Sequence, residues 1–491
     1  MRTRAKCLVN VALVGVLPIH LLAQQPFALD PTFQTDIDDW YVSSIAPTVD
    51  GKVILSGRIR FSPAGEYVTM ARLMSSGQRD LTYYESGLGG GKIVPWTDRF
   101  YVAGNVSVRR ILEDGTNDLG FQMGVSGIPY FSPLQGGDYH VYPDGRILMS
   151  GGHILSDSVR GFEGLYNLIW FSNTGYLDTT RTHRTSNGIV YQFEQLPDGR
   201  FICSGTCTEY EGQPTANIFQ VDADGALDPT FQSALTSGEM RTFTPLEDGR
   251  ILASGLVMTY DGATDTTQFV RYLPGGSLDP TFNNDIVVRS AQYQRLTLPG
   301  HTLLPGGRIL LHGIFDQVDG QPRSGIALLD ENGELLNTAF TGEGCGPFYH
   351  TGIFYTHISG AAHLADSMMY IYGAYYGYDD GTTNDPDQRF VTRLYGPDFA
   401  TGVQERTGEP TSRLWPVPAK ATLHVAPLGD VRTLAVTDLQ GREVLRANAM
   451  GRDEAVLSIG ALAPGSYVLR ARDPSTGSGR GGRVLGRFVK E

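Results

Sequence analysis

PDGRILMSG (Pro143–Gly151) is the stretch of sequence that decides the fold, because close copies of it recur along the chain. The clearest other copies are VDGKVILSG (Val49–Gly57), PDGRFICSG (Pro197–Gly205) and EDGRILASG (Glu247–Gly255). An Asp-Gly pair is a strong signal for a hairpin turn, and the apolar run that follows is typical of a strand buried on both faces. Weaker copies are TDRFYVAG (Thr97–Gly104), GGRILLHG (Gly306–Gly313) and DSMMYIYG (Asp366–Gly373).

The spacing of these copies indicates the architecture. Measured between the glycines that end them, from Gly57 to Gly373, the mean spacing is about 53 residues, near the ~40–50 residues of known propeller blades. A regular repeat of this length in a β-rich chain predicts a β-propeller, and the number of copies predicts seven blades.

A second phrase, Leu-Asp-Pro-Thr-Phe, recurs at Leu29–Phe33, Leu227–Phe231 and Leu278–Phe282. Proline has no N–H to donate to a sheet, so the phrase is expected at a sheet edge or at the start of a strand. With three clear strands per copy, the phrase would complete about four strands per blade. The first phrase precedes every blade and the last strand, Arg389–Tyr395, has no phrase after it, so we expect these two segments to pair and to close the ring.

The units Tyr210–Phe231, Tyr260–Phe282 and Phe315–Phe340 resemble the delta-60 repeat β-propellers, which are common in secreted bacterial proteins. The resemblance covers the central part of the chain and implies the fold more than any activity.

The two ends of the chain differ from the repeats. Arg2, Arg4 and Lys6 precede an apolar stretch that ends near Ala23, which predicts a signal peptide at residues 1–23. The alternative is a membrane anchor, but the stretch is shorter than the ~20 residues that a helical span needs. No later segment is predicted to span a membrane.

The C-terminal part loses the repeat and changes charge, with twelve Lys or Arg against seven Asp or Glu in residues 411–491. Its short strand-like runs predict a small β-sandwich. The motifs Leu414–Ala419, Asp438–Val444 and Leu462–Arg470 closely resemble the type A C-terminal sorting domain of the type IX secretion system of Bacteroidota. That resemblance implies export through this machinery, which would be the partner of residues 413–491, and a location outside the cell or on the outer-membrane surface.

The predicted fold class is therefore all-β: a seven-bladed β-propeller at residues 24–399, a linker at 400–412 and an immunoglobulin-like β-sandwich at 413–491. The net charge of −13 argues against a nucleic-acid partner, since phosphates would be repelled. Three cysteines lie beyond the signal segment, Cys203, Cys207 and Cys345, and we expect free thiols or a single bridge.

The sequence contains no recognisable catalytic motif, metal-ligand pattern or cofactor signature. The last repeat is enlarged and rich in tyrosine and aspartate. Tyrosine rings suit sugar faces, and carboxylates in an exposed loop could hold calcium, although a tyrosine-rich strand with a solvated acidic loop explains the same pattern. The candidate binding residues are Tyr375, Tyr376, Tyr378, Asp379, Asp380, Asp385 and Asp387.

Two functions follow from these observations. The first is a non-catalytic recognition module that binds a glycan or a surface protein. The second is an extracellular polysaccharide hydrolase or lyase on a propeller scaffold, which would need two carboxylates near the central channel. A non-catalytic spacer on the cell surface also remains open. The sequence favours a protein without enzyme activity.

Overall fold

The computed structural model describes residues 26–104, 107–123, 131–235, 237–259, 266–290, 297–350, 353–364, 368–396, 413–426, 428, 433–438, 442–449, 454–472 and 483–490. The chain divides into two compact units, Met1–Gly402 and Val403–Glu491. In the described residues both units consist of β-strands, with one short 3-10 turn, η1 (Pro305–Gly307). The prediction of an all-β protein is confirmed. The predicted signal segment 1–23 and linker 400–412 lie outside the described residues.

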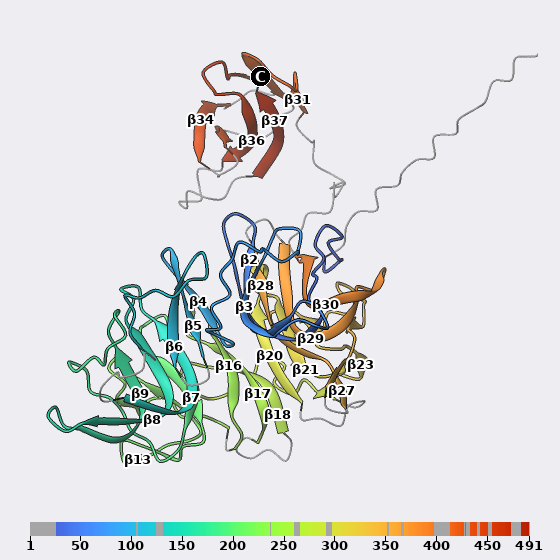
Figure 1. Ribbon diagram of the computed structural model, residues 1–491. Coiled ribbons are helices and arrows are strands. Elements are labelled where there is room, and N and C mark those ends of the chain that lie inside the picture. The colour runs from blue at the N-terminus through green and yellow to red at the C-terminus, as the bar shows by residue number, and fades with distance from the viewer. Residues whose placement is uncertain are drawn as a thin grey trace, which may run out of the picture. The chain divides into compact units, whose positions relative to one another are not determined.

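The first unit is a succession of antiparallel sheets, each named below by its central strand (Figure 1). In each, the first two strands form a hairpin and a third strand pairs with the central one. The sheets consist of β1 (Asp39–Pro47), β2 (Val53–Arg60) and β3 (Val68–Leu73); β4 (Ile93–Trp96), β5 (Arg99–Ala103) and β6 (Val108–Leu112); β7 (Phe131–Val141), β8 (Ile147–Asp157) and β9 (Phe162–Phe171); β10 (Val190–Gln195), β11 (Phe201–Gly205), β14 (Ile218–Val221) and β15 (Leu227–Asp228); β16 (Met240–Pro245), β17 (Ile251–Thr259) and β18 (Thr266–Tyr272); β20 (Leu298–Leu303), β21 (Ile309–Ile314) and β24 (Ile326–Leu329); and β28 (His357–His363), β29 (Met368–Asp379), β30 (Asn384–Tyr395) and β25 (Gly344–Cys345), which pairs with β29.

Short strands outside these sheets form small ribbons. They are β12 (Glu209–Tyr210) with β13 (Gln213–Pro214); β19 (Val288–Arg289) with β22 (Gln317–Val318) and β23 (Gln321–Pro322); and β26 (Phe348–His350) with β27 (Ile353–Tyr355). The β8 and β11 sheets also touch, through one pair of residues, Gly151 and Val190.

The Asp-Gly turns form as predicted. In the copy at Pro197, the Leu196 N–H donates to the Arg200 carbonyl at 2.7 Å and the Gly199 N–H donates to the Leu196 carbonyl at 2.9 Å. Gly199 has a φ of 90°, a left-handed conformation that glycine adopts without the clash of a Cβ. Behind the turn every residue of β11 is buried, as expected for a central strand.

The glycine that ends β11, Gly205, is needed for a steric reason. A Cβ on Gly205 would overlap the carbonyl oxygen of Ile189, which precedes the first strand of the same sheet. The register of that strand shifts between Val190 and Gln192, a β-bulge that brings the backbone close to the central strand. The recurring glycine is therefore required wherever the first strand bulges in this way.

The serine before this glycine connects neighbouring sheets. The Ser204 hydroxyl oxygen accepts a hydrogen bond from the Met240 N–H at 2.9 Å, and the Ser56 hydroxyl oxygen accepts one from the Gly90 N–H at 2.9 Å. Met240 is the first residue of β16, and Gly90 lies just before β4, so each donor belongs to the start of the next sheet.

First strands of neighbouring sheets contact one another, and the first of them, β1, also contacts β28 of the last sheet. Strand β1 contacts β4 and β28, β10 contacts β7 and β16, and β20 contacts β16 and β28. Figure 1 shows the blue strands of the β2 sheet beside the orange strands of the β29 sheet, which follows more than 300 residues later in the chain. Contacts of this kind are the ones that a propeller requires.

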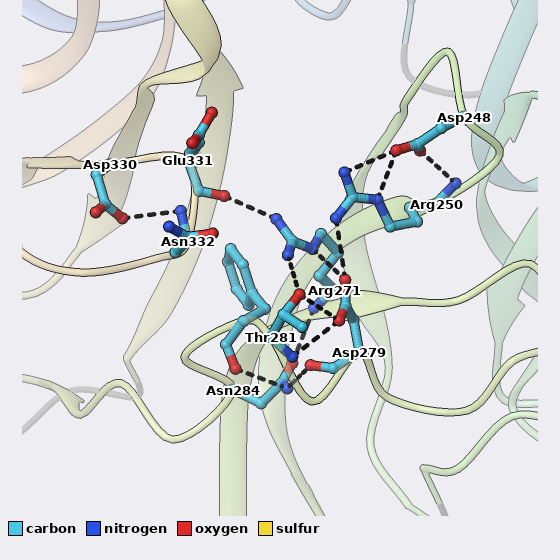
Figure 2. A network of polar contacts seen from close by, with 10 residues as sticks. Asp248, Arg250, Arg271, Asp279, Thr281, Asn284, Asp330, Glu331 and Asn332 are labelled. Carbon is cyan, nitrogen blue, oxygen red and sulfur yellow. Dashed lines mark hydrogen bonds and ion pairs between the residues drawn. The ribbon is translucent and has the colours of Figure 1, made fainter.

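An arginine–aspartate pair holds the Leu-Asp-Pro-Thr-Phe phrase against its sheet (Figure 2). The Arg271 Nε donates to the Asp279 carboxylate at 2.8 Å, and the other carboxylate oxygen accepts the Thr281 N–H and hydroxyl at 2.9 and 2.7 Å. The Arg271 Nη1 continues to the carbonyl of Glu331 in the next sheet at 2.7 Å. We call this arrangement the latch, because one guanidinium joins a strand, a phrase and the following sheet.

The latch recurs with the same geometry. Arg72 with Asp80 and Arg110 with Asp118 repeat it in the β2 and β5 sheets, where the guanidinium reaches the carbonyls of Glu113 and Asn173. Each arginine lies eight residues before its aspartate.

The N-terminal phrase pairs with the last sheet of the unit, as predicted. The Phe27 N–H donates to the Tyr395 carbonyl at 2.7 Å, the Tyr395 N–H returns a bond to the Ala28 carbonyl at 2.9 Å, and Leu29 bridges to Leu394. Asp30 accepts the Arg393 Nε at 2.7 Å, so this junction has a latch of its own, made from two distant parts of the chain. The predicted pairing of Leu29–Phe33 with Arg389–Tyr395 is confirmed.

Apolar side chains fill the space between neighbouring sheets. Ile54 and Met70 of the β2 sheet form one buried cluster with Phe100 and Val102 of the β5 sheet. Cys203, Cys207 and Cys345 are buried free thiols. Among the described residues there is no helix with the length and apolar character that a membrane crossing requires.

The second unit contains two antiparallel sheets around one apolar cluster. The cluster includes Leu423 and Leu457 from the first sheet and Val436 and Leu469 from the second. The sheets consist of β31 (Arg413–Trp415), β32 (Thr422–Ala426) and β35 (Ala455–Ser458), and of β34 (Glu443–Asn448), β33 (Thr433–Thr437), β36 (Gly465–Arg472) and β37 (Arg483–Lys490).

Candidate functional site

A pocket of about 450 Å³ lies in the first unit, between the loop that follows β21 and the far end of β29. Three of the residues predicted from the sequence, Tyr376, Tyr378 and Asp379, are among the residues that line it. The lining residues are Asp316, Pro322, Arg323, Ser324, Glu343, Gly344, Cys345, Gly346, Pro347, Tyr376, Gly377, Tyr378, Asp379, Asn384 and Pro386.

Arg323 supplies the positive charge of the pocket and is held rigidly. Its Nη1 donates to the Pro322 carbonyl at 2.6 Å, and its Nη2 donates to Asn337 Oδ1 at 2.9 Å and to the Phe340 carbonyl at 3.1 Å. Burial lowers the pKa of Arg323, an effect that the Glu343 carboxylate partly offsets. Because arginine keeps its proton in proteins, the guanidinium is a fixed cation in the wall.

Three carboxylate residues, Asp316, Glu343 and Asp379, also line the pocket. Asp316 is buried, whereas Glu343 is exposed at the rim. Asp379 accepts the Gly381 N–H at 2.8 Å, which fixes the turn at the end of β29. The pocket therefore offers several hydrogen-bond acceptors and one strong donor, a combination that suits hydroxyl or amine groups of a ligand.

Tyr376 is the lining residue whose ring belongs to an aromatic cluster. Its ring packs edge-on against Phe348 and Phe390, with centroids 5.3 and 5.4 Å away, and the Arg389 guanidinium lies 5.1 Å from it. Burial, followed by the nearby Asp39 carboxylate, raises the pKa of Tyr376, so the phenol is neutral at physiological pH.

The other two predicted tyrosines are core residues. Tyr375 donates its hydroxyl to Thr392 Oγ1 at 2.7 Å, and Tyr378 donates to the Phe27 carbonyl at 2.8 Å. Both side chains are at most 1% exposed. Tyr378 therefore holds the N-terminal segment in place and does not present its ring to a ligand.

The remaining predicted aspartates organise their own turns. Asp380 accepts the Thr382 N–H and hydroxyl, both at 2.7 Å, and Asp385 accepts the Asp387 N–H at 2.9 Å. Asp387 is exposed. Within the described part of the chain, no three His, Cys, Asp or Glu side chains are grouped so that they could hold a metal ion. Calcium binding stays a prediction.

A second polar cluster, which the sequence analysis missed, lies where the first strands of three neighbouring sheets approach one another. Lys92 Nζ donates to both carboxylate oxygens of Asp138, at 2.9 and 3.1 Å, and Gln192 Nε2 donates to the same carboxylate at 2.6 Å. These residues occupy matching positions, opposite Ala103, Ser150 and Ser204 in their central strands. Residue-by-residue alignment of the first strands would have found the cluster.

The charges of this cluster influence one another. Burial lowers the pKa of Lys92, but the carboxylates of Asp138 and Glu194 outweigh it, so that the pKa is raised. Glu194, two residues after Gln192, has a raised pKa because burial penalises its charge more than Lys92 favours it. Burial and the Lys92 charge lower the pKa of His140 to about 4, which keeps this imidazole neutral.

Comparison with protein families supports the propeller. The family described as a domain of unknown function (DUF5122) beta-propeller matches residues 196–231, 246–282 and 304–335. Each stretch begins immediately before a repeat turn, and together they cover parts of the β11, β17 and β21 sheets. No curated protein sequence matches the chain.

Solved structures resemble the chain at low identity. PorZ, an essential bacterial surface component of the type-IX secretion system of Porphyromonas gingivalis, shares 12% identity with a TM-score of 0.34, over 92% of this chain and 66% of PorZ. The extracellular domain of BT4673 from B. thetaiotaomicron shares 11% identity with a TM-score of 0.36, over 92% of this chain and 55% of that protein. YCF48 bound to D1 peptide shares 11% identity with a TM-score of 0.33, over 76% of this chain and 99% of YCF48. The chain thus spans less than two thirds of the length of the first two, and we transfer no function from proteins this distant.

Proposed function

We propose that the chain is a secreted or cell-surface protein whose first unit is a seven-bladed β-propeller that recognises a glycan or a protein without catalysis. The contacts between first strands, including the one between β1 and β28, support the blade arrangement, and the bonds from Lys92 to Asp138 of β7 join the second sheet to the third. The N-terminal segment, paired with β30, would complete the last blade.

Export is the second part of the proposal. The motifs Leu414–Ala419 and Leu462–Arg470 resemble those of type A sorting domains, and the two sheets around one core are consistent with an immunoglobulin-like sandwich. We propose that residues 413–491 are recognised by the type IX secretion machinery after a signal peptide has directed the chain across the inner membrane. The protein then acts outside the cell or on the outer-membrane surface.

The observation that carries the recognition function is the pocket beside Tyr376. An aromatic ring can pack on the apolar face of a sugar, while Arg323 donates to hydroxyl oxygens and Glu343 accepts from hydroxyl groups. A pocket of about 450 Å³ lies within the usual range for small-ligand sites and would hold one or two sugar rings.

A pocket variant tests this function. Replacing Glu343 by Gln removes an exposed acceptor charge and keeps the shape of the side chain. We expect the full chain to bind specific members of a glycan array, and the Glu343→Gln variant to bind the same glycans at least tenfold more weakly, about 1.4 kcal/mol. Glu163→Gln, at an exposed glutamate outside the pocket lining, is the matched control and should bind normally. Binding that is insensitive to Glu343→Gln, or no binding to any glycan or surface protein, would refute the proposal.

The polar cluster around Lys92 favours a second candidate, a polysaccharide hydrolase. Glycosidases use one carboxyl group that stays protonated and one that stays ionised. Asp138 forms an ion pair with Lys92 at 2.9 Å, whereas burial raises the pKa of Glu194. Glu194 would be the acid and Asp138 the base or nucleophile.

This candidate predicts a distinct pH dependence. Because the pKa of Glu194 is higher in the folded chain than in the unfolded one, its ionisation destabilises the fold as pH rises through that interval. The Glu194→Gln variant should therefore melt above the wild type at pH 7 and together with it below about pH 4. Melting curves at several pH values, with reducing-sugar release from polysaccharides, provide the measurement. A lower melting temperature at pH 7 contradicts the raised pKa, and sugar release unchanged by Glu194→Gln eliminates the hydrolase.

A further inference from the structure

Four side chains form an exposed aromatic surface at one end of the β2 sheet. We call Trp40, Tyr41, Arg58 and Tyr67 the aromatic platform. Tyr41 and Tyr67 are each 37% exposed, Arg58 is exposed and Trp40 is half-buried. None of the four lines the pocket beside Tyr376.

An unusual backbone conformation places the Trp40 ring on this surface. In a regular strand successive side chains alternate between faces, so Tyr41 and Trp40 would point in opposite directions. Trp40 pairs with Ile59, which is fully buried, and regular geometry would direct the tryptophan toward the same side as Ile59. Instead Trp40 has a φ of 93°, and its ring lies 6.4 Å from that of Tyr41 and 5.9 Å from that of Tyr67.

This conformation is strained for a bulky residue, which rarely has a positive φ. Such a conformation persists only where the surrounding structure holds it, and residues of this kind cluster at functional sites. A hydrogen bond from the Trp40 N–H to Asp39 Oδ1, at 2.9 Å, holds the conformation. The consequence is an exposed group of three rings that ordinary strand geometry would not produce.

The Arg58 guanidinium stacks on these rings, and within the described residues the N–H groups in its plane are not used in an ion pair. Its guanidinium carbon lies 4.7 Å from the Trp40 ring and 4.4 Å from the Tyr67 ring. Arg60, by contrast, is paired with Asp38 and Asp39, both at 2.9 Å. Across the described ranges, no carboxylate pairs with Arg58. Rings cover the faces of a stacked guanidinium, so its in-plane N–H groups remain available for an oxyanion, which they bind in bidentate fashion.

We propose that the aromatic platform binds an acidic saccharide, in which a sugar ring carries a carboxylate or a sulfate. The oxyanion accepts hydrogen bonds from Arg58, and the ring packs on the exposed tyrosine faces. The Asp39 carboxylate, which accepts the Tyr67 hydroxyl at 3.0 Å, is paired with Arg60. The net charge of −13 acts mainly from farther away, and charges beyond a Debye length of ~8 Å are screened at physiological ionic strength. The inference goes beyond the proposed function, since it assigns a ligand class to a surface outside the pocket.

Titration of the full chain with defined saccharides tests the proposal. The probes are oligogalacturonate, κ-carrageenan oligosaccharides, which are charged by sulfate alone, and neutral maltoheptaose. Binding is followed by tryptophan fluorescence and calorimetry. We expect one of the two acidic probes to bind and the neutral one not to bind. The Arg58→Gln variant should lose at least tenfold in affinity, and Arg58→Lys should recover only part of it because it lacks the planar fork. The response identifies whether the oxyanion is a carboxylate or a sulfate.

Two further variants separate binding from folding. Trp40→Gly suits a positive φ, so it should keep the fold by circular dichroism and lose binding. Arg146→Gln is the matched control, because Arg146 also stacks on a tyrosine, Tyr142, but is already paired with Asp144 at 2.7 Å. No binding of either acidic probe, equal binding of maltoheptaose, or unchanged affinity in Arg58→Gln overturns the proposal. Equal binding of poly-glutamate overturns the saccharide assignment. Loss of binding in Arg58→Gln but not in Glu343→Gln distinguishes the platform from the pocket.

Discussion

Replacing Arg271 by Met is expected to lower the free energy of unfolding by about 3–5 kcal/mol, the usual cost of removing one partner from a buried ion pair. Arg271 and Asp279 are each 4% exposed, so the variant leaves a carboxylate buried without its principal partner. It also removes the bond from Nη1 to the Glu331 carbonyl, which connects the β17 and β21 sheets (Figure 2). Urea unfolding followed by circular dichroism measures the change.

Arg250 provides a matched control for this substitution. It reaches the same Asp279 carboxylate at 3.1 Å, but it is 32% exposed and also pairs with the exposed Asp248. Because exposed pairs contribute roughly 0–1 kcal/mol, Arg250→Gln should cost little. If both variants lower the free energy of unfolding equally, the charge of the arginine stabilises the fold and the bond to the next sheet adds nothing.

The latch also predicts that the first unit loses stability at acid pH. Burial would raise the pKa of Asp279, but hydrogen bonds from Thr281, Arg250 and Arg271 outweigh it and hold the pKa well below its usual value. A lowered pKa in the folded state contributes stability at neutral pH, and that contribution is lost as pH falls below about 4, the ordinary value for aspartate. In Arg271→Met this part of the acid sensitivity should be smaller than in the wild type.

Local signals explain why much of the first unit could be predicted. A turn such as Leu196–Arg200 is specified by residues within one short stretch, and the central strand after it follows from an apolar run. The pairing of the N-terminal phrase with β30 followed from the order of phrases along the chain. The latch was not predicted, although an arginine stands eight residues before Asp80, Asp118 and Asp279 in the sequence, because its carbonyl partner is supplied by the neighbouring sheet.

The candidate site was harder to predict, because it depends on irregular strands. Strand β29 shifts register between Tyr372 and Tyr376 and again between Tyr376 and Tyr378, so simple alternation does not reveal which tyrosine is buried. Arg323 reaches the pocket from a different sheet. The positive φ of Trp40 leaves no trace in composition, since tryptophan is not a residue that favours it.

Deleting residues 24–36 is expected to destabilise the first unit more than any single substitution. The segment buries Phe27 and Phe33 completely, against Phe340 and Tyr370 at ring distances of 5.5 and 5.2 Å. Truncation of one buried phenylalanine costs about 3–5 kcal/mol, so loss of two approaches the ~5–15 kcal/mol stability of a whole domain. Deletion also leaves β30 as an unpaired edge, which promotes association between chains.

Addition of the missing segment as a peptide separates its pairing from general truncation effects. A synthetic peptide of residues 24–36 should raise the melting temperature of the deleted chain, because it can restore the bonds of Phe27 and Asp30 to β30. The same peptide with Asp30→Asn should be less effective, since it cannot form the ion pair with Arg393 at 2.7 Å. An unchanged melting temperature after deletion would show that the first and last sheets hold together without the segment, and the closure of the unit would then depend on their apolar faces alone.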